Sequence, residues 1–224
     1  GVDHCATAGP IAGLKVDRKA PGITITAPAD GAVYLLGQPV AAAYGCADGG
    51  SGLTNCAGTV ANTVNVDTLT VGTKTFKVDS ADGAGNLGTR TVTYTVRYDF
   101  AGFFRPVDNK DGSGNYILNV VKAGSAVPIK FSLGGNKGLN IMTSGYPTSK
   151  KIACGDTPTT DTIESTVTAG SSSLSYDATT DQYTYVWKTD KNWATDTTQG
   201  PCRQLVVKLA DGQSYFAVFK FTRT

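Results

Sequence analysis

The chain has 224 residues, a net charge of +2 and only 17% charged residues, with one histidine (His4) and one glutamate (Glu164). These counts exclude a histidine-dependent nucleophile deep in a fold, a zinc site built from several histidines, and a pair of glutamates acting as acid and base. No basic block suggests nucleic acid. No apolar run approaches the 18 to 20 residues or so that span a bilayer.

The length predicts about two domains, because single domains commonly hold about 100 to 150 residues. Residues 1–20 are expected to be the end of a preceding unit or a linker, without the charged and apolar regions of a signal peptide. Pro21 should stop strand pairing at the junction. The first domain is placed at 21–98 and the second at 99–224.

Short strand-like runs alternate with turn residues in the first predicted domain. A regular alternation in the last run places Val92, Tyr94 and Val96 on one face and threonines on the other, which is typical of a half-buried strand. A glycine-rich loop is expected at 46–56. The predicted strands are 23–26, 32–36, 40–46, 64–69, 73–80 and 88–98.

The second predicted domain also consists of short strand-like runs separated by turn residues. Residues 126–133 alternate between apolar and polar, 174–177 and 182–189 form a predicted hairpin, and 205–222 form another with Asp211-Gly212 at its turn. The polar stretch 189–200 could hold a helical turn or an open loop. The fold class predicted from these patterns is all-β, with two tandem Ig-like β-sandwich domains.

The five cysteines favour an oxidised, extracytoplasmic protein with two disulfides. Cys46 is paired with Cys56, and Cys154 with Cys202, because each pair falls within one predicted domain. Cys5 would then be free or paired with a residue upstream. The alternative is that all five thiols are reduced and buried.

A row of aromatic side chains is the strongest candidate for a binding surface. Tyr183, Tyr185 and Trp187 occupy alternate positions of one strand and so share a face, and Trp193 follows shortly after. Exposed, the row could stack on sugar rings, whereas buried it would be core. The opposite face is only half apolar, which favours the core.

Lys130 and Glu164 are candidates for an isopeptide crosslink, in which Lys130 would join an Asn or Asp with Glu164 as the assisting acid. The alternative, which we favour, places Lys130 on the solvent face of an alternating strand beside Pro128 and Ser132.

Two aspartate-rich turns are candidates for calcium. One loop begins with Asp108, Asn109 and Asp111, and the other is the turn with Asp79, Asp82 and Asn86. The first lacks the bidentate glutamate of a strong calcium loop. Aspartate and asparagine are also what a tight turn requires, so we favour a structural role. No cofactor is expected other than this structural calcium.

Residues 22–98 resemble the bacterial Ig-like repeats of large secreted proteins, through YGCADGGSGLTNC, VDTLTVGTKTFKVDSADGAGN and TVTYTV. Residues 99–222 resemble the PxKF domain, which takes its name from the motif at Pro128–Phe131. The matching segments are GFFRPVDN, LNVVKAGSAVPIKFSLGGNKGLNI, SLSYDATTDQYTYVWKTDKNW and CRQLVVKLADG. The segment KDGSGNY at 110–116 departs from the pattern as an insertion.

The resemblance implies a non-catalytic structural or adhesive module of a larger secreted or cell-surface bacterial protein, whose partners are the upstream domains of the same polypeptide. A polysaccharide or a cell-surface molecule is a further expected partner. The alternative is a carbohydrate-binding accessory module that anchors a secreted enzyme to polysaccharide. An enzyme is not expected, because nearly all the aspartates lie in turns.

Overall fold

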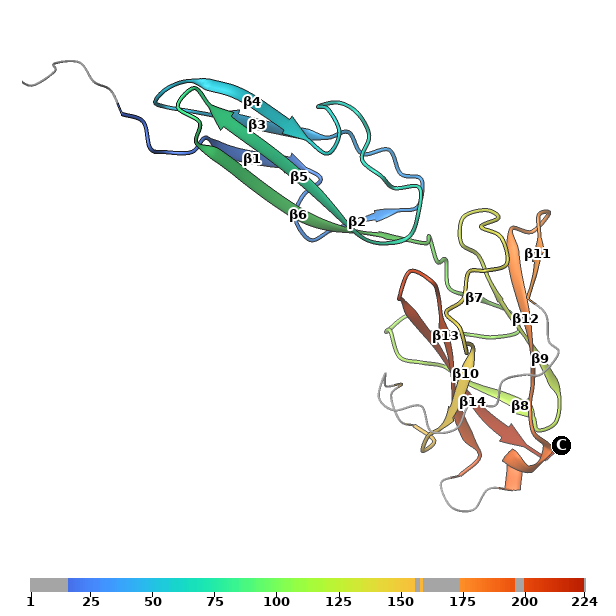
Figure 1. Ribbon diagram of the computed structural model, residues 1–224. Helices are drawn as coiled ribbons and strands as arrows, with labels where there is room; N and C mark the ends of the chain where they lie inside the picture. Colours follow the sequence, from blue (N-terminus) through green and yellow to red (C-terminus); the bar gives the residue numbers. More distant parts are fainter. Residues whose placement is uncertain (1–15, 156–157, 159–173, 196–199, 224) are drawn as a thin grey trace, which may run out of the picture. The chain divides into compact units, whose positions relative to one another are not determined.

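The computed structural model describes residues 16–155, 158, 174–195 and 200–223, so His4, Cys5 and Glu164 lie outside the described residues. The described part of the chain is all-β, with one short 3-10 helix (Figure 1). Contacts divide it into two compact units. The first is Gly1–Ala32, Pro39–Asp67 and Thr73–Tyr94, and the second is Val33–Gln38, Thr68–Gly72 and Thr95–Thr224.

The first six strands form two sheets. The smaller sheet pairs β1 with β3, and the larger has the order β2-β6-β5-β4. The bounds are β1 Gly22–Ala27, β2 Ala32–Leu35, β3 Ala43–Ala47, β4 Leu53–Gly58, β5 Gly72–Asp82 and β6 Leu87–Arg97.

The core of these strands follows from their alternation. In β6, Val92, Tyr94 and Val96 are buried while Thr91 and Thr93 are exposed, as the period-two pattern predicts. In β5 the inward side chains are Phe76, Val78, Ser80 and Asp82.

Two predictions for this part were wrong. The expected glycine-rich loop contains a strand, β4, which pairs with β5 and shows a register shift between Leu53 and Asn55. The expected strand at 64–69 is a connection, and only Asn65 forms a bridge there, to Ala41. Backbone bonds from Ala42 to Val64 and from Val66 to Val40 hold the connection in place.

The remaining strands form a second sandwich of two four-stranded sheets, with the orders β10-β13-β14-β8 and β11-β12-β9-β7. The pairing of β14 with β8 is parallel. The bounds are β7 Phe103–Phe104, β8 Leu118–Lys122, β9 Ala126–Phe131, β10 Thr148–Lys151, β11 Ser175–Asp177, β12 Gln182–Lys188, β13 Cys202–Lys208 and β14 Ser214–Thr222. The 3-10 helix η1 covers Lys191–Thr195.

Both predicted hairpins of this part are present. β11 and β12 pair across the turn after Asp177, and β13 and β14 pair across the turn at Asp211-Gly212, where Gly212 has a φ of 84°. The predicted alternation in β9 buries Val127, Ile129 and Phe131. The core of this sandwich is rich in aromatic residues from both sheets. No helix in the described part of the chain is long and apolar enough to cross a membrane.

Candidate functional site

Both predicted disulfides are present. Cys46 in β3 bonds to Cys56 in β4, which joins the two sheets of the first sandwich with a Cα–Cα distance of 5.9 Å. Cys154 follows β10 and bonds to Cys202 at the start of β13, with a Cα–Cα distance of 5.2 Å. The first bond joins the two sheets of its sandwich, and the second joins the segment after β10 to β13, the neighbouring strand of the same sheet, so each bond lies within one sandwich, as expected of an oxidised protein.

The predicted aromatic row is buried and does not lie at the surface. Tyr183, Tyr185, Trp187 and Trp193 are 0%, 6%, 1% and 6% exposed. The side chains of β12 face inward because their partners in β9 are the buried Phe131, Ile129 and Val127. The Trp193 ring from η1 lies 5.5 Å from Trp187 and 5.0 Å from Phe221. These residues form the core, which is the interpretation that the sequence favoured, and the alternative of an exposed sugar platform at these four residues is wrong.

Lys130 lies on the face of β9 opposite to the core, between the buried Ile129 and Phe131. Its neighbours across the strands are Thr184 and Phe104. Glu164, the other half of the predicted crosslink, is outside the described residues. The crosslink stays a prediction, and the placement of Lys130 agrees with the solvent-face alternative.

The loop that begins at Asp108 is held by its own hydrogen bonds. Asp111 accepts the backbone N–H groups of Asn115 and Ser113, each at 2.9 Å, and these bonds lower the pKa of its carboxyl. Asp108 is tied through its backbone to the side chain of Asn119. This arrangement is a tight turn, and it does not direct the Asp108 and Asp111 carboxylates into a shared cluster of three acidic groups within the described ranges.

The two aspartates of the second aspartate-rich turn lie on opposite faces of β5. Asp79 is partly exposed and binds Lys77 at 2.9 Å and the Thr89 hydroxyl at 2.7 Å. Asp82 is 4% exposed and accepts three hydrogen bonds within the turn, from the backbone of Ala84 and from the backbone and side chain of Asn86. Asp79 and Asp82 therefore have separate roles.

The structure brings together three carboxylates that the sequence analysis did not group. Single oxygen atoms of Asp17, Asp48 and Asp82 all lie within 4.8 Å of one another. The residues come from the segment before β1, the loop between β3 and β4, and the turn between β5 and β6. The signal in the sequence is that three turns of this sandwich carry an aspartate, but only the strand order brings these turns to one end.

Hydrogen bonds explain the position of each member of this carboxylate cluster. Asp17 accepts N–H bonds from Lys19 at 3.0 Å and from Ser51 at 2.7 Å, which lower the pKa of its carboxyl. Asp48 accepts the backbone N–H groups of Gly50 and Gly52. A set of oxygen ligands of this kind could hold a hard cation such as calcium. The bond from Ser51 to Asp17, together with the bond that the Asn86 side chain donates to the Asp17 carbonyl at 3.3 Å, also fastens the three segments to one another without a cation.

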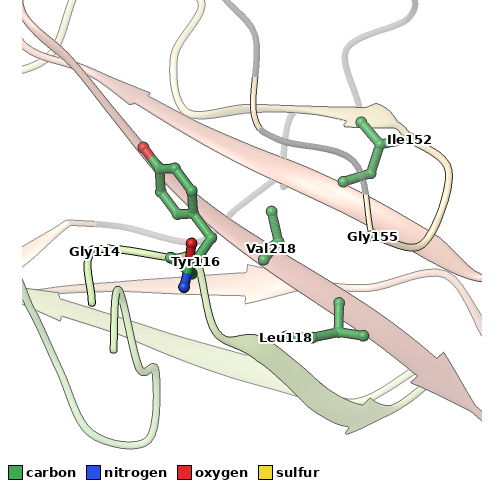
Figure 2. A pocket seen from close by; sticks show the side chains of 7 residues that line it. Gly114, Tyr116, Leu118, Ile152, Gly155 and Val218 are labelled. Carbon is green, nitrogen blue, oxygen red and sulfur yellow. The ribbon is translucent and has the colours of Figure 1, made fainter. Parts of the chain in front are cut away.

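The second sandwich has two hollows that share Tyr116. The first has a volume of about 260 Å³ and is lined by Tyr116, Leu118, Ile152 and Val218, with Gly114, Asn115 and Gly155. Figure 2 shows the Tyr116 ring on one side, Ile152 on the opposite side and Val218 between them. Its floor belongs to the outer face of the sheet that contains β8 and β14.

The second hollow is more open and has a volume of about 350 Å³. It combines aromatic and hydrogen-bonding groups and is lined by Phe100, Ala101, Gly102, Asn109, Lys110, Tyr116, Ser214, Tyr215 and Phe216. These aromatic residues could not be predicted as a group, because they have no regular spacing in the sequence. Only the fold brings the loop before β8 next to β14.

No family model and no curated protein matches the chain. Among solved structures, it is similar to the fibronectin(III)-like modules of Clostridium thermocellum CbhA (12% identity, 90% of this chain and 94% of that chain, TM-score 0.30). It is also similar to Bacteroides ovatus SGBP-B in complex with a mixed-linkage heptasaccharide (12%, 92% and 48%, 0.25) and to Dpr2 Ig1-Ig2 in complex with DIP-Theta (12%, 90% and 64%, 0.27). At these identities the likeness concerns the β-sandwich fold alone.

Proposed function

We propose that the chain is a non-catalytic structural module of a larger secreted or cell-surface protein, and that its two sandwiches space or display neighbouring domains of the same polypeptide. The observation that carries this proposal is that each sandwich contains its own disulfide. The boundary between the modules is proposed at 98/99, with a bacterial Ig-like repeat before it and a PxKF-type domain after it.

The placement of the polar groups supports a structural role. The carboxylates of Asp17, Asp82 and Asp111 are engaged by backbone N–H groups and serve to fasten loops. The aromatic rings of β12 are in the core. A disulfide limits how far each sandwich can extend under load, because the segment between the two bonded cysteines cannot be stretched out.

Single-molecule stretching tests this role. The sequence separations of the two disulfides are 10 and 48 residues. At about 3.6 Å per extended residue, the oxidised chain should release about 35 Å less contour length from the first sandwich and about 170 Å less from the second than the reduced chain. Extension without force peaks in the oxidised protein, like that of an unstructured chain, would contradict the mechanical role.

A further inference from the structure

The open hollow beside Tyr116 combines the two kinds of group that bind sugars. Tyr116, Tyr215 and Phe216 offer aromatic surface and are each half-buried, while Asn109 and Ser214 offer an amide and a hydroxyl. A few placed polar groups on a mainly apolar wall are typical of small-molecule sites. We call this hollow the Tyr116 cleft.

Register places Phe216 of the Tyr116 cleft on the outer face of the sheet, whereas the stacked rings of Phe100 and Tyr215 line the cleft from the edge of the core. Phe216 pairs with Val206 in the β13–β14 hairpin, and the next residue, Ala217, is fully buried in the core. Alternation along β14 therefore turns Phe216 to the outer face of the sheet. Tyr116 comes to this face from the loop before β8, where its backbone bridges to Lys110.

The cleft and the apolar hollow of Figure 2 are neighbours, because Tyr116 lines both. Val218 in the apolar hollow is two residues after Phe216 on the same face of β14. Two hollows on either side of one tyrosine provide room for more than one ring, which favours a chain of sugars over a single monosaccharide.

The charge of the cleft lining favours an acidic glycan over a neutral one. Among the described residues that line the cleft, Lys110 alone has a charged side chain, and its Nζ lies 4.7 Å from the centre of the Tyr116 ring. No aspartate is among the described residues that line the cleft. A cation with an open side and no carboxylate beside it in the lining is complementary to an anionic ligand.

We propose that the Tyr116 cleft binds an acidic oligosaccharide, with sugar rings packed against Phe216 and against the part of the Tyr116 ring that Lys110 leaves open, and with a uronate carboxylate bound by Lys110. The hydroxyl groups of the sugar would bond to Asn109 and Ser214. This binding activity is independent of the mechanical role, since it depends on one surface of the second sandwich.

Calorimetric titration of the full chain with an oligogalacturonate of five units, and with cellopentaose as a neutral probe of equal length, tests the proposal. We expect the uronate to bind about tenfold or more tightly than the neutral probe. Lys110→Met should weaken uronate binding about tenfold, the range expected for loss of one charged hydrogen bond. Tyr116→Ala should abolish it, and Tyr116→Phe should retain it.

Lys208→Met is the matched control. Lys208 also lies over a tyrosine ring, that of Tyr146 at 5.7 Å, but neither residue lines the cleft. It should bind the uronate as the wild type does, which separates the site from general attraction between a basic protein and a polyanion. The proposal is overturned if neither probe binds, if both bind equally, or if Lys110→Met binds as tightly as Lys208→Met. Should Tyr116→Ala fail to fold, the lysine pair still decides.

Discussion

Among single residues, Asp82 has the clearest structural task. Its carboxylate is 4% exposed and accepts N–H groups from Ala84 and Asn86 at 2.9 and 2.8 Å, and the Asn86 side chain at 2.7 Å. Removing the carboxylate breaks all three bonds and leaves the backbone N–H of Asn86 without its acceptor, while Ala84 and the Asn86 side chain keep their bonds to Ser51 and Asp17. Asp82→Ala should therefore lower the free energy of unfolding of the first sandwich by about 2 to 4 kcal/mol in urea denaturation followed by circular dichroism.

Asp79→Ala is the control for this substitution. Asp79 lies on the same strand and also accepts hydrogen bonds, but its side chain is 47% exposed in its pair with Lys77. Surface pairs of this kind contribute about 0 to 1 kcal/mol. Equal losses for the two substitutions would contradict the argument from burial.

The sequence of the turn predicts that Asp82 accepts hydrogen bonds within its own turn, because aspartate followed by glycine is common in tight turns. The approach of Asp17 and Asp48 to Asp82 could not be predicted from the same signal. It depends on which loops the strand order brings to one end of the sandwich. Tyr116 and Phe216 are a similar case, since the cleft they share joins segments far apart in the sequence.

Among the elements, the two disulfides should differ in their contribution to stability. The first closes a loop with a sequence separation of 10 and the second one of 48. The loop-entropy model gives about 3 kcal/mol for the shorter loop and about 4 kcal/mol for the longer one. Replacing Cys154 and Cys202 by serine should thus destabilise the second sandwich more than replacing Cys46 and Cys56 destabilises the first. Urea denaturation of the two double variants measures both losses, and the opposite order would contradict the model.

The strands that the sequence predicts well are those with one buried face. β9 alternates over its length and β6 alternates from Thr91 onward, and the burial of Val92, Val96 and Ile129 follows. β10 has the sequence TSKK and no apolar alternation, yet it pairs with β13, and Thr148 and Ser149 are 2% and 1% exposed. Such a strand is held in its conformation by backbone hydrogen bonds to the neighbouring strand. This is a tertiary effect, which the local sequence pattern does not predict.

For the whole molecule, the aspartates determine how the stability of the fold changes at low pH. Hydrogen bonds donated to the charged carboxylates lower the pKa values of six aspartates below the ordinary value of 3.8. These are Asp17, Asp30, Asp79, Asp111, Asp177 and Asp181. A carboxyl with a lower pKa in the folded state adds stability above its unfolded pKa and loses it as the pH falls through the folded pKa.

Both sandwiches should therefore keep their melting temperatures between pH 7 and about pH 5 and lose stability progressively below about pH 4. Differential scanning calorimetry across this range measures the effect. The same series in 1 M salt separates the causes, because screening weakens charge pairs more than short hydrogen bonds. A melting temperature that stays constant or rises between pH 4 and pH 2 would contradict the assignment.

The boundary between the modules can be tested at Tyr98. The proposed boundary at 98/99 assigns this residue to the first module, but its ring is 8% exposed within the core of the second sandwich. Its N–H donates to Asp211, itself 6% exposed, at 3.0 Å. A fragment of residues 95–224 should therefore be about 3 to 4 kcal/mol more stable than one of residues 99–224, from burial of the ring and from the bond to Asp211.

Urea denaturation followed by tryptophan fluorescence measures this difference, because Trp187 and Trp193 both lie in the core of these fragments. Tyr98→Ala in the longer fragment separates the two contributions, since it removes the ring and keeps the backbone N–H. Its stability should fall between those of the two fragments. Equal midpoints for the two fragments would instead mean that Tyr98 adds nothing to the second module, and the boundary would stay at 98/99.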